Sequence, residues 1–205
     1  DEELRRVMPA LELIASQVHV PLSIDTYKSG VARRAAEVGV SIINDVWGLK
    51  HDISVAEVAA EFGCLLVLMH NQAGMVYKEL IRDVSDSLSW SVNSALRAGV
   101  QERHIIVDPG IGFGKTADHN LRVLNQLRSF RELGRPILVG TSRKSTIGLV
   151  LGDAPIEERL EGTAASVAIA IANGADVVRV HDVREIVRVC RMSDAIVRGW
   201  PRLPQ

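Results

Sequence analysis

The chain has 205 residues, of which 47% are hydrophobic, 24% are charged and 4% are aromatic, which is the ordinary composition of a globular domain. A chain of this length can bury a core without help from disulfides or metal ions. Its 24 basic and 25 acidic residues give a formal net charge of −1, which provides no general attraction to nucleic acid or to an anionic membrane surface. No apolar run approaches the roughly 20 residues of a membrane span, and no basic and apolar leader opens the sequence, so a cytoplasmic location is expected.

Short apolar runs rich in β-branched residues alternate with amphipathic stretches along the chain. A helical stripe of apolar residues opens the sequence, and the following runs predict six strands with helices between them. Strands are expected at 21–25, 41–46, 64–70, 105–108, 136–141 and 176–180. Further helices are expected at about 31–38, 55–62, 78–98, 120–133, 144–150, 163–172 and 183–197.

Glycines mark the ends of the predicted helices. Five of them stand just before a predicted strand, where a left-handed helix C-cap is expected: Gly39, Gly63, Gly99, Gly134 and Gly174. Strands that are apolar almost without interruption are typical of a parallel sheet covered by helices on both faces. No Gly/Ser-rich linker or low-complexity segment divides the sequence, so residues 1–205 are expected to form one domain.

Polar residues stand at the carboxyl end of nearly every predicted strand. They are Asp25, Asn44, Asp45, His70, Asp108, Ser142 and His181. A doubly wound sheet usually concentrates its chemistry at one switch point, whereas a barrel carries functional residues around the whole ring of strand ends. The expected fold is therefore an α/β, (β/α)₈ TIM barrel. At about 34 residues a unit, eight units need roughly 270 residues, so the first two β/α units are expected to precede Asp1.

Three of these strand ends carry hydrogen-bond acceptors. Asp25 alone could simply be the N-cap of the next helix, and Asn44-Asp45 has the same ambiguity. Recurrence at Asp108, on a third strand, favours a binding function. Carboxylates only accept hydrogen bonds, and together with an amide they can bind a flat heterocycle that presents N–H donors along one edge. Without a ligand or a cation, neighbouring buried carboxylates would repel one another.

The glycine-rich segment DPGIGFGKT at 108–116 resembles a phosphate-binding loop without being one. Pro109 stands where a Walker A motif requires glycine. A flexible loop between strand and helix would account for the glycines. Alternatively, the glycines let the backbone approach a ligand while Phe113 covers an aromatic face. The sequence alone leaves both interpretations open.

Basic residues follow the last two predicted strands. Arg143 and Lys144 could be solvated, or they could form an anion or carbonyl site beside the Ser142 hydroxyl at a helix N-terminus. Arg179 and His181 share one face of their strand, and the valines between them take the other. A buried, unpaired arginine would be costly, which indicates a function for Arg179. Arg179, His181 and Lys144 are predicted to form a cationic cluster for pyrophosphate or another polyanion.

Six short motifs occur in an order found in one enzyme family. They are SIDT at 23–26, INDV at 43–46, LMH at 68–70, DPGIGFGKT at 108–116, GTSRKS at 140–145 and RVHDV at 179–183. The series spans essentially the whole chain and is far more specific than any single motif. It resembles the dihydropteroate synthase family, the pterin-binding enzymes of folate synthesis.

This resemblance implies a reaction and its participants. A barrel enzyme would join 4-aminobenzoate to the methylene group of 6-hydroxymethyl-7,8-dihydropterin pyrophosphate and release pyrophosphate with the help of Mg²⁺. It would be a cytoplasmic homodimer, joined through helices of the later part of the barrel, and a target of sulfonamides. The nearest alternatives are a methyltetrahydrofolate methyltransferase, which has no reason to keep SRKS with Arg179 and His181, and a non-catalytic pterin-binding barrel.

The resemblance also implies a role for each candidate residue. The pterin edge would be held by Asp25, Asn44, Asp108 and Lys144. The ring or the aminobenzoate would be contacted by Met69, Phe113 and Gly140, with Ser142 and Arg143 close to the aminobenzoate. Pyrophosphate would be held by Arg179 and His181, with Asn44. Lys144, Arg179 and His181 would be the catalytic set, because stabilising the departing anion electrostatically would carry the rate.

The sequence departs from the family pattern at several points. The family's first strand supplies an asparagine that ligates Mg²⁺, and the loop after the second supplies an aspartate, but neither motif occurs in residues 1–205. The metal ligand is therefore expected upstream of Asp1. Thr146 stands where an aromatic residue commonly follows SRKS, and Asn71-Gln72 replaces Met-Arg. Both changes fall on the aminobenzoate side and leave the response to inhibitors open.

Overall fold

The structure is a computed structural model that describes residues 2–200. Their contacts form two compact units. The first comprises the chain up to Asn71 together with Asp86–Asp108, and the second comprises Gln72–Ser85 and the chain from Pro109 onward. The expectation of a single domain stays a prediction.

Four parallel strands form the sheet of the first unit in the order β1-β2-β3-β4. Their bounds are β1 Ser23–Asp25, β2 Ile42–Asp45, β3 Leu65–Met69 and β4 Ile105–Asp108. The register places Asp25 opposite Asn44, and Met69 opposite Asp108. Because parallel strands end at the same edge of a sheet, the polar strand ends of this unit gather along one edge.

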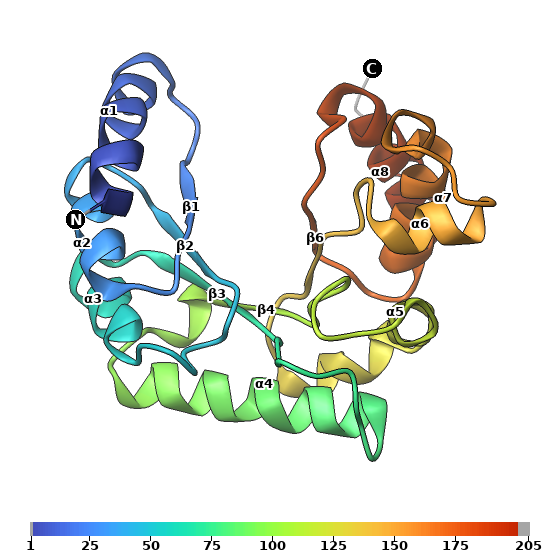
Figure 1. Cartoon of the computed structure of the whole chain (residues 1–205), viewed down its shortest axis with the longest axis horizontal. Helices are drawn as coiled ribbons and strands as arrows, with labels where there is room; N and C mark the ends of the chain where they lie inside the picture. The colour runs from blue at the N-terminus through green and yellow to red at the C-terminus, as the bar shows by residue number, and fades with distance from the viewer. Residues whose placement is uncertain (1, 201–205) are drawn as a thin grey trace. The chain divides into compact units, whose positions relative to one another are not determined.

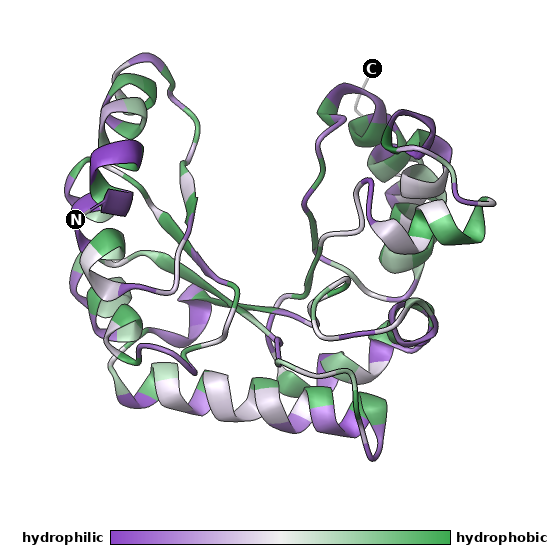
Figure 2. Ribbon diagram, viewed as in Figure 1, coloured by the Kyte–Doolittle hydropathy of each residue, from purple (hydrophilic) through white to green (hydrophobic). Residues whose placement is uncertain are grey.

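Helices cover one side of this sheet. The helices of the first unit are α1 Glu2–Gln17, α2 Ser29–Glu37 and α3 Ser54–Phe62, with residues 86–97 of α4 Leu80–Arg97 and the 3₁₀ helix η1 Glu102–His104. Of these, α1, α2 and α3 lie side by side (Figure 1). Alternate strand residues are buried toward them: Ile24, Ile43, Leu66, Leu68, Ile105 and Val107. Figure 2 shows the hydrophobic residues concentrated along β3 and β4. The neighbouring positions on each strand therefore face the opposite side of the sheet.

The second unit is mainly helical. Its elements are α5 Ala117–Asn125, η2 Leu127–Leu133, β5 Leu138–Val139, α6 Ser145–Val150, η3 Ile156–Glu158, α7 Leu160–Ala172, β6 Val177–Val178 and α8 Val183–Val197. β5 and β6 pair in parallel, and α7 packs on α8. Val178 and Val180 contact a core formed by Val167, Ile171 and Ile186. The predicted division of the last strand, with its valines turned toward the helices, is thus confirmed.

The sequence pattern locates most elements correctly. All six predicted strands are present and parallel, and the five predicted capping glycines all have positive φ angles, between 64° and 101°. The predicted helix 120–133 is wrong in its extent, because α5 ends at Asn125 and a 3₁₀ helix follows. Asn173 Nδ2 donates to the carbonyl oxygens of Leu124 and Asn125, at 2.9 and 3.1 Å, and so provides two of the terminal helix carbonyls with a donor. Within residues 2–200, no helix has the length and apolar content that a membrane crossing requires.

Candidate functional site

An unpartnered buried acceptor lies at the edge of the first sheet. Asn44 Nδ2 donates to Asp25 Oδ1 at 2.9 Å, and the Asn44 side chain is nearly buried. The carboxylate can only accept, so the amide must present its NH₂ group to it and its oxygen elsewhere. That oxygen, Asn44 Oδ1, is buried without a hydrogen-bond partner. Leaving such an acceptor unpaired is costly, and a ligand donor at this point would relieve the cost.

The two structural alternatives for Asp25 and for Asn44-Asp45 are now decided. Lys28, and not Asp25, is the N-cap residue of α2. Asp45 points away from Asn44, because successive strand residues face opposite sides, and its carboxylate accepts from the N–H groups of Trp47 at 2.8 Å and Leu49 at 2.7 Å. Burial raises the pKa of Asp45, while these backbone donors oppose the shift. Asp45 therefore closes a turn, and Asn44 is the member of the pair that remains for binding.

Met69 and Asp108 share the face that carries Asn44. Asn44 pairs with Val67, which lies two residues before Met69, and Met69 pairs with Asp108. Both side chains are nearly buried, at 3% and 6% exposure. The structure thus brings together the four predicted site residues of the first unit on one face of the sheet.

In the second unit, the glycine-rich loop has a fixed conformation. Gly110, Gly112 and Gly114 adopt positive φ angles of 72°, 81° and 56°. The buried Lys115 ammonium donates to the carbonyl oxygens of Gly110 at 3.0 Å and Phe113 at 3.2 Å. Lys115 thus binds the loop itself, unlike the lysine of a Walker A motif, which reaches a bound phosphate. The interpretation of this segment as a flexible connection stays a prediction.

Tyr77 provides a further tie to this loop from outside it. Its hydroxyl group donates to the Gly114 carbonyl oxygen at 2.7 Å. Burial, assisted by the negative charge of Asp83, raises the pKa of Tyr77 to about 12. The phenol therefore keeps the proton of this hydrogen bond throughout the physiological pH range.

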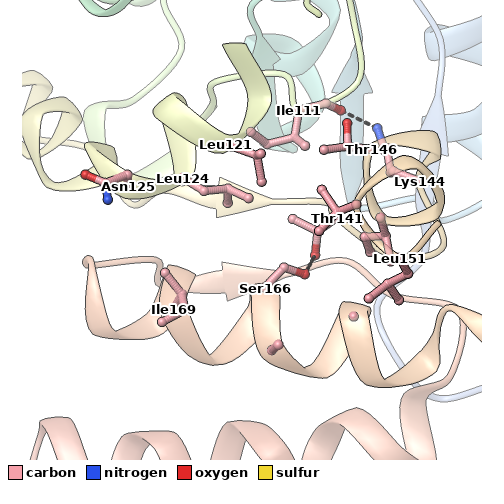
Figure 3. A pocket seen from close by; sticks show the side chains of 14 residues that line it. Ile111, Leu121, Leu124, Asn125, Thr141, Lys144, Thr146, Leu151, Ser166 and Ile169 are labelled. Carbon is pink, nitrogen blue, oxygen red and sulfur yellow. Dashed lines mark hydrogen bonds between the residues drawn. The ribbon is translucent and has the colours of Figure 1, made fainter. Parts of the chain in front are cut away.

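Lys144 lies against the same loop. Its ammonium group donates to the Ile111 carbonyl oxygen (Figure 3) and lies 4.2 Å from the centroid of the Phe113 ring. A Cβ atom on Gly112 would come within 2.6 Å of Lys144 Cδ, so only glycine permits this approach. The structure brings two predicted site residues, Phe113 and Lys144, into direct contact.

Ser142 and His181 form a hydrogen-bonded pair. Ser142 Oγ accepts from the backbone N–H of His181 at 3.1 Å and lies 2.8 Å from His181 Nδ1. The two contacts hold the Ser142 hydroxyl group against both the backbone and the ring of His181 and so fix the direction of the imidazole. Gly140 lies beside Arg179, because a Cβ atom at Gly140 would be 3.9 Å from the Arg179 carbonyl oxygen.

Arg143 is paired with a carboxylate and is not a solvated cation. It adopts a positive φ of 57°, and its guanidinium binds both oxygens of Asp182, with Nε 2.9 Å from Oδ2. The hydrogen bonds raise the pKa of Arg143 and lower that of Asp182. Arg143 therefore links the loop after β5 to the loop after β6 and has its charge already compensated.

The expectation of a buried Arg179 is wrong. Arg179 and His181 are exposed. The reason is that Val178 and Val180 occupy the buried face of the strand, which turns the residues between them to the open face. The assignment of Arg179 therefore rests on its place beside Gly140 and on the matching motif, and no longer on a cost of burial.

Sequence reasoning missed Asn120. Its side chain is 2% exposed and uses both ends of its amide, accepting from the Gly112 N–H at 2.8 Å and donating to Thr146 Oγ1 at 2.9 Å. The available signal was its spacing, since Asn120 shares the buried face of α5 with Val123 and Leu124. A polar residue in an apolar helical stripe requires buried hydrogen-bond partners.

An apolar cavity of about 440 Å³ opens between α5, α6 and α7 (Figure 3). Leu121, Leu124, Leu151 and Ile169 supply much of its lining. Thr141 also lines it and faces the side of the β5 segment opposite to Gly140 and Ser142. The lining is mainly apolar, and Lys144 is the one candidate site residue among the residues that line the cavity.

No three histidine, cysteine, aspartate or glutamate side chains within residues 2–200 form a group that could hold a metal ion. The Mg²⁺ expected from the sequence therefore lacks a set of protein ligands among these residues.

Comparison with known proteins identifies close relatives. Residues 1–181 match a family model described as pterin binding enzyme. The chain is 52% identical over 197 residues to the dihydropteroate synthase of Bacillus subtilis, covering 96% of the chain and 69% of that relative. It is 50% identical over 199 residues to the dihydropteroate synthase of Clostridium beijerinckii, covering 97% and 74%.

Solved structures that resemble this chain are also dihydropteroate synthases. The dihydropteroate synthase of Clostridium difficile, solved in the presence of pteroic acid, matches with a TM-score of 0.93 and 45% identity, over 97% of this chain and 75% of that one. The enzyme of Xanthomonas albilineans with 4-aminobenzoic acid matches with a TM-score of 0.91 and 36% identity, over 98% and 73%. This likeness confirms the α/β barrel class predicted from the sequence.

Proposed function

The chain belongs to the pterin-binding enzyme family, within its dihydropteroate synthase group, and from this premise we propose how its residues act on the substrates. The reaction is a group transfer. The amine nitrogen of 4-aminobenzoate bonds to the methylene carbon of the dihydropterin pyrophosphate, the bond from that carbon to the pyrophosphate oxygen breaks, and the amine loses a proton. Dihydropteroate and pyrophosphate are the products.

The unpartnered Asn44 oxygen is the observation that carries the proposal for the pterin. A pterin presents N–H donors along one edge, and a buried acceptor beside the Asp25 carboxylate suits such an edge. Asp108, on the same face, would supply a further acceptor, and Met69 would lie along the ring.

The second unit supplies donors and cations. Lys144, whose ammonium group is already directed by the Ile111 carbonyl, would donate to an acceptor atom of the pterin, with Phe113 covering a ring face. Arg179 and the His181 ring would hold the pyrophosphate. Ser142 would orient His181, and Arg143 would act near the aminobenzoate through the loops that it joins to Asp182.

Charge stabilisation would be the main source of the rate. Negative charge grows on the pyrophosphate oxygen as its bond to carbon breaks, and donors fixed in advance stabilise that charge without reorganising. Mg²⁺ would supply further neutralisation of the same anion. The Mg²⁺ requirement, sensitivity to sulfonamides and a cytoplasmic location stay predictions.

We propose that the chain forms a homodimer through the apolar surface around the α5–α7 cavity. Leu149, Val150, Leu151 and Ile169 are 48–60% exposed there, and an apolar surface of this kind is typical of an interface between copies. Val150→Glu is expected to convert a dimer to a monomer in sedimentation velocity experiments. Val76→Glu, at a more exposed valine of the same unit, should leave the dimer intact. A monomeric parent chain would contradict the proposal.

The function is tested by turnover. With 4-aminobenzoate, dihydropterin pyrophosphate and Mg²⁺, the full-length protein, including the units expected upstream of Asp1, should form dihydropteroate and pyrophosphate in equal amounts, and omission of Mg²⁺ should stop the reaction. Lys144→Ala should lower kcat/KM about a hundredfold, the loss typical of one electrostatic donor. Pterin binding without pyrophosphate release would instead indicate a non-catalytic pterin-binding protein. Equal rates in the parent and the variant would remove Lys144 from the mechanism.

A further inference from the structure

We infer that Asn120 is a positioning residue for Lys144, held in place by Thr146, and that this pair tunes recognition of the pterin substrate. The inference rests on the proposed role of Lys144 at the pterin. Neither Asn120 nor Thr146 needs to touch a substrate. They act on Lys144 through the peptide group between Ile111 and Gly112 in the glycine-rich loop.

The orientation of the Asn120 amide is fixed by its partners. The Gly112 N–H can only donate, so Asn120 must turn its oxygen toward it, at 2.8 Å. The NH₂ group then faces Thr146 Oγ1, at 2.9 Å. All three residues lie in the second unit, and Asn120 and Thr146 are nearly buried, at 2% and 5% exposure. Solvent cannot substitute for the buried hydrogen bond between Asn120 and Thr146 without entering the core.

The Gly112 N–H and the Ile111 C=O belong to the same peptide group. Asn120 binds the N–H end of this group, and the Lys144 ammonium binds the C=O end. A peptide group is planar, so fixing its N–H direction also fixes the direction of its carbonyl. Figure 3 shows the hydrogen bond from the Lys144 ammonium group to the Ile111 carbonyl oxygen. The hydrogen bonds thus form a relay from Thr146 through Asn120 and the peptide to Lys144, in which each bond polarises the next.

The loop needs this restraint because of its glycines. Gly112 has a φ of 81° and packs so closely on the Lys144 side chain that a Cβ atom would clash. Glycine also permits other backbone conformations at little cost, so the 111–112 peptide could rotate if its N–H were not held. Rotation would withdraw the carbonyl oxygen from Lys144 and let the ammonium group move away from the position in which it meets the pterin.

The inference predicts for which of the two substrates KM changes when the relay is disrupted. Lys144 is proposed to bind the pterin, so a defect in the relay should raise KM for the pterin pyrophosphate and leave KM for 4-aminobenzoate unchanged. A direct contact of Thr146 with the aminobenzoate would give the opposite pattern. A merely structural role would lower the melting temperature and affect both substrates alike.

The test uses two substitutions at Thr146 in the full chain. Thr146→Val removes the hydroxyl group at nearly constant volume and leaves the Asn120 NH₂ group buried without an acceptor, and kcat/KM for the pterin pyrophosphate should fall about tenfold. Thr146→Ser keeps the hydroxyl group and should retain most of the parent value. Asn120→Leu should show the full effect of losing the relay, and Arg122→Leu, at an exposed residue of the same helix outside the cavity lining, serves as the control.

The parent's turnover tests the proposed function, and the valine–serine comparison tests the inference. If the parent is inactive, the same comparison of pterin binding by titration calorimetry decides the inference. Equal behaviour of the valine and serine variants would overturn it. So would a rise in KM for 4-aminobenzoate, or a loss that affects both substrates and follows the melting temperature.

Discussion

Replacement of Arg179 by alanine is expected to lower kcat/KM for the condensation by about 10²–10³-fold, the range found when one preorganised donor to a developing anion is removed. The residue is exposed on the open face of its strand, so its loss should leave the core of Val167, Ile171 and Ile186 intact. The melting temperature should therefore change little. The effect should appear in kcat as well as in KM, because the charge on the leaving group is greatest in the transition state.

A second variant separates charge from geometry. Arg179→Lys keeps the positive charge but loses the planar fork that binds two phosphate oxygens at once, so its activity should lie between those of the parent and the alanine variant. Inhibition by added pyrophosphate should weaken in the same order. Arg188→Ala, at an exposed arginine of α8, is the matched control and should behave like the parent. Parent-like kinetics and pyrophosphate inhibition in Arg179→Ala would show that the anion binds elsewhere.

The strands were predictable because their signal is local. Runs such as 105–108 are apolar, β-branched and bounded by turn residues, and β4 has the bounds that the pattern predicts. The capping glycines were predictable for the same reason, since a left-handed residue is required wherever a helix turns back into a parallel strand. The end of α5 was not, because the donor that binds its last carbonyls is Asn173, 48 residues further along the chain.

The site was predictable in its residue types and less so in its pairings. Alternation along β2 places Asn44 and Asp45 on opposite faces of the sheet. Only the structure shows that the Asp45 carboxylate accepts hydrogen bonds from the N–H groups of a turn. Arg143 and Asp182 stand 39 residues apart, and neither residue alone indicates the other as its partner. For Arg179 the alternation correctly predicted a side chain on the face opposite to the valines. It did not predict that this side chain is exposed, because periodicity does not show which other elements cover that face.

Asn120 illustrates a different limit. Its importance follows from what its amide joins, the Gly112 N–H, 8 residues away, and Thr146 Oγ1, 26 residues away. A motif describes residues that are near one another along the chain. A relay through a backbone peptide leaves no such pattern, apart from one polar residue in an apolar helical stripe.

The substitution Asn44→Asp should weaken pterin binding about a hundredfold at mildly alkaline pH, because two carboxylates about 3 Å apart cannot both remain ionised without a large penalty. The change is nearly isosteric and replaces the NH₂ group that now donates to Asp25 Oδ1 at 2.9 Å. The new pair would share one proton, and repulsion would raise the higher of its two apparent pKa values.

The sign of the pH dependence follows from that shared proton. As pH falls through the raised pKa, the proton restores a donor between the two side chains, so pterin affinity should partly recover toward mildly acidic pH, whereas the parent has no such pair to titrate. Titration calorimetry across this range measures the effect, with Asn93→Asp, at an exposed asparagine of α4 in the same unit, as the control for an added charge. Affinity that is parent-like at every pH would mean that Asn44 does not face the pterin. Pterin affinity that is equally weak at every pH would show that the substitution acts by disturbing side-chain packing. Only a proton shared between the two carboxylates would restore affinity at low pH.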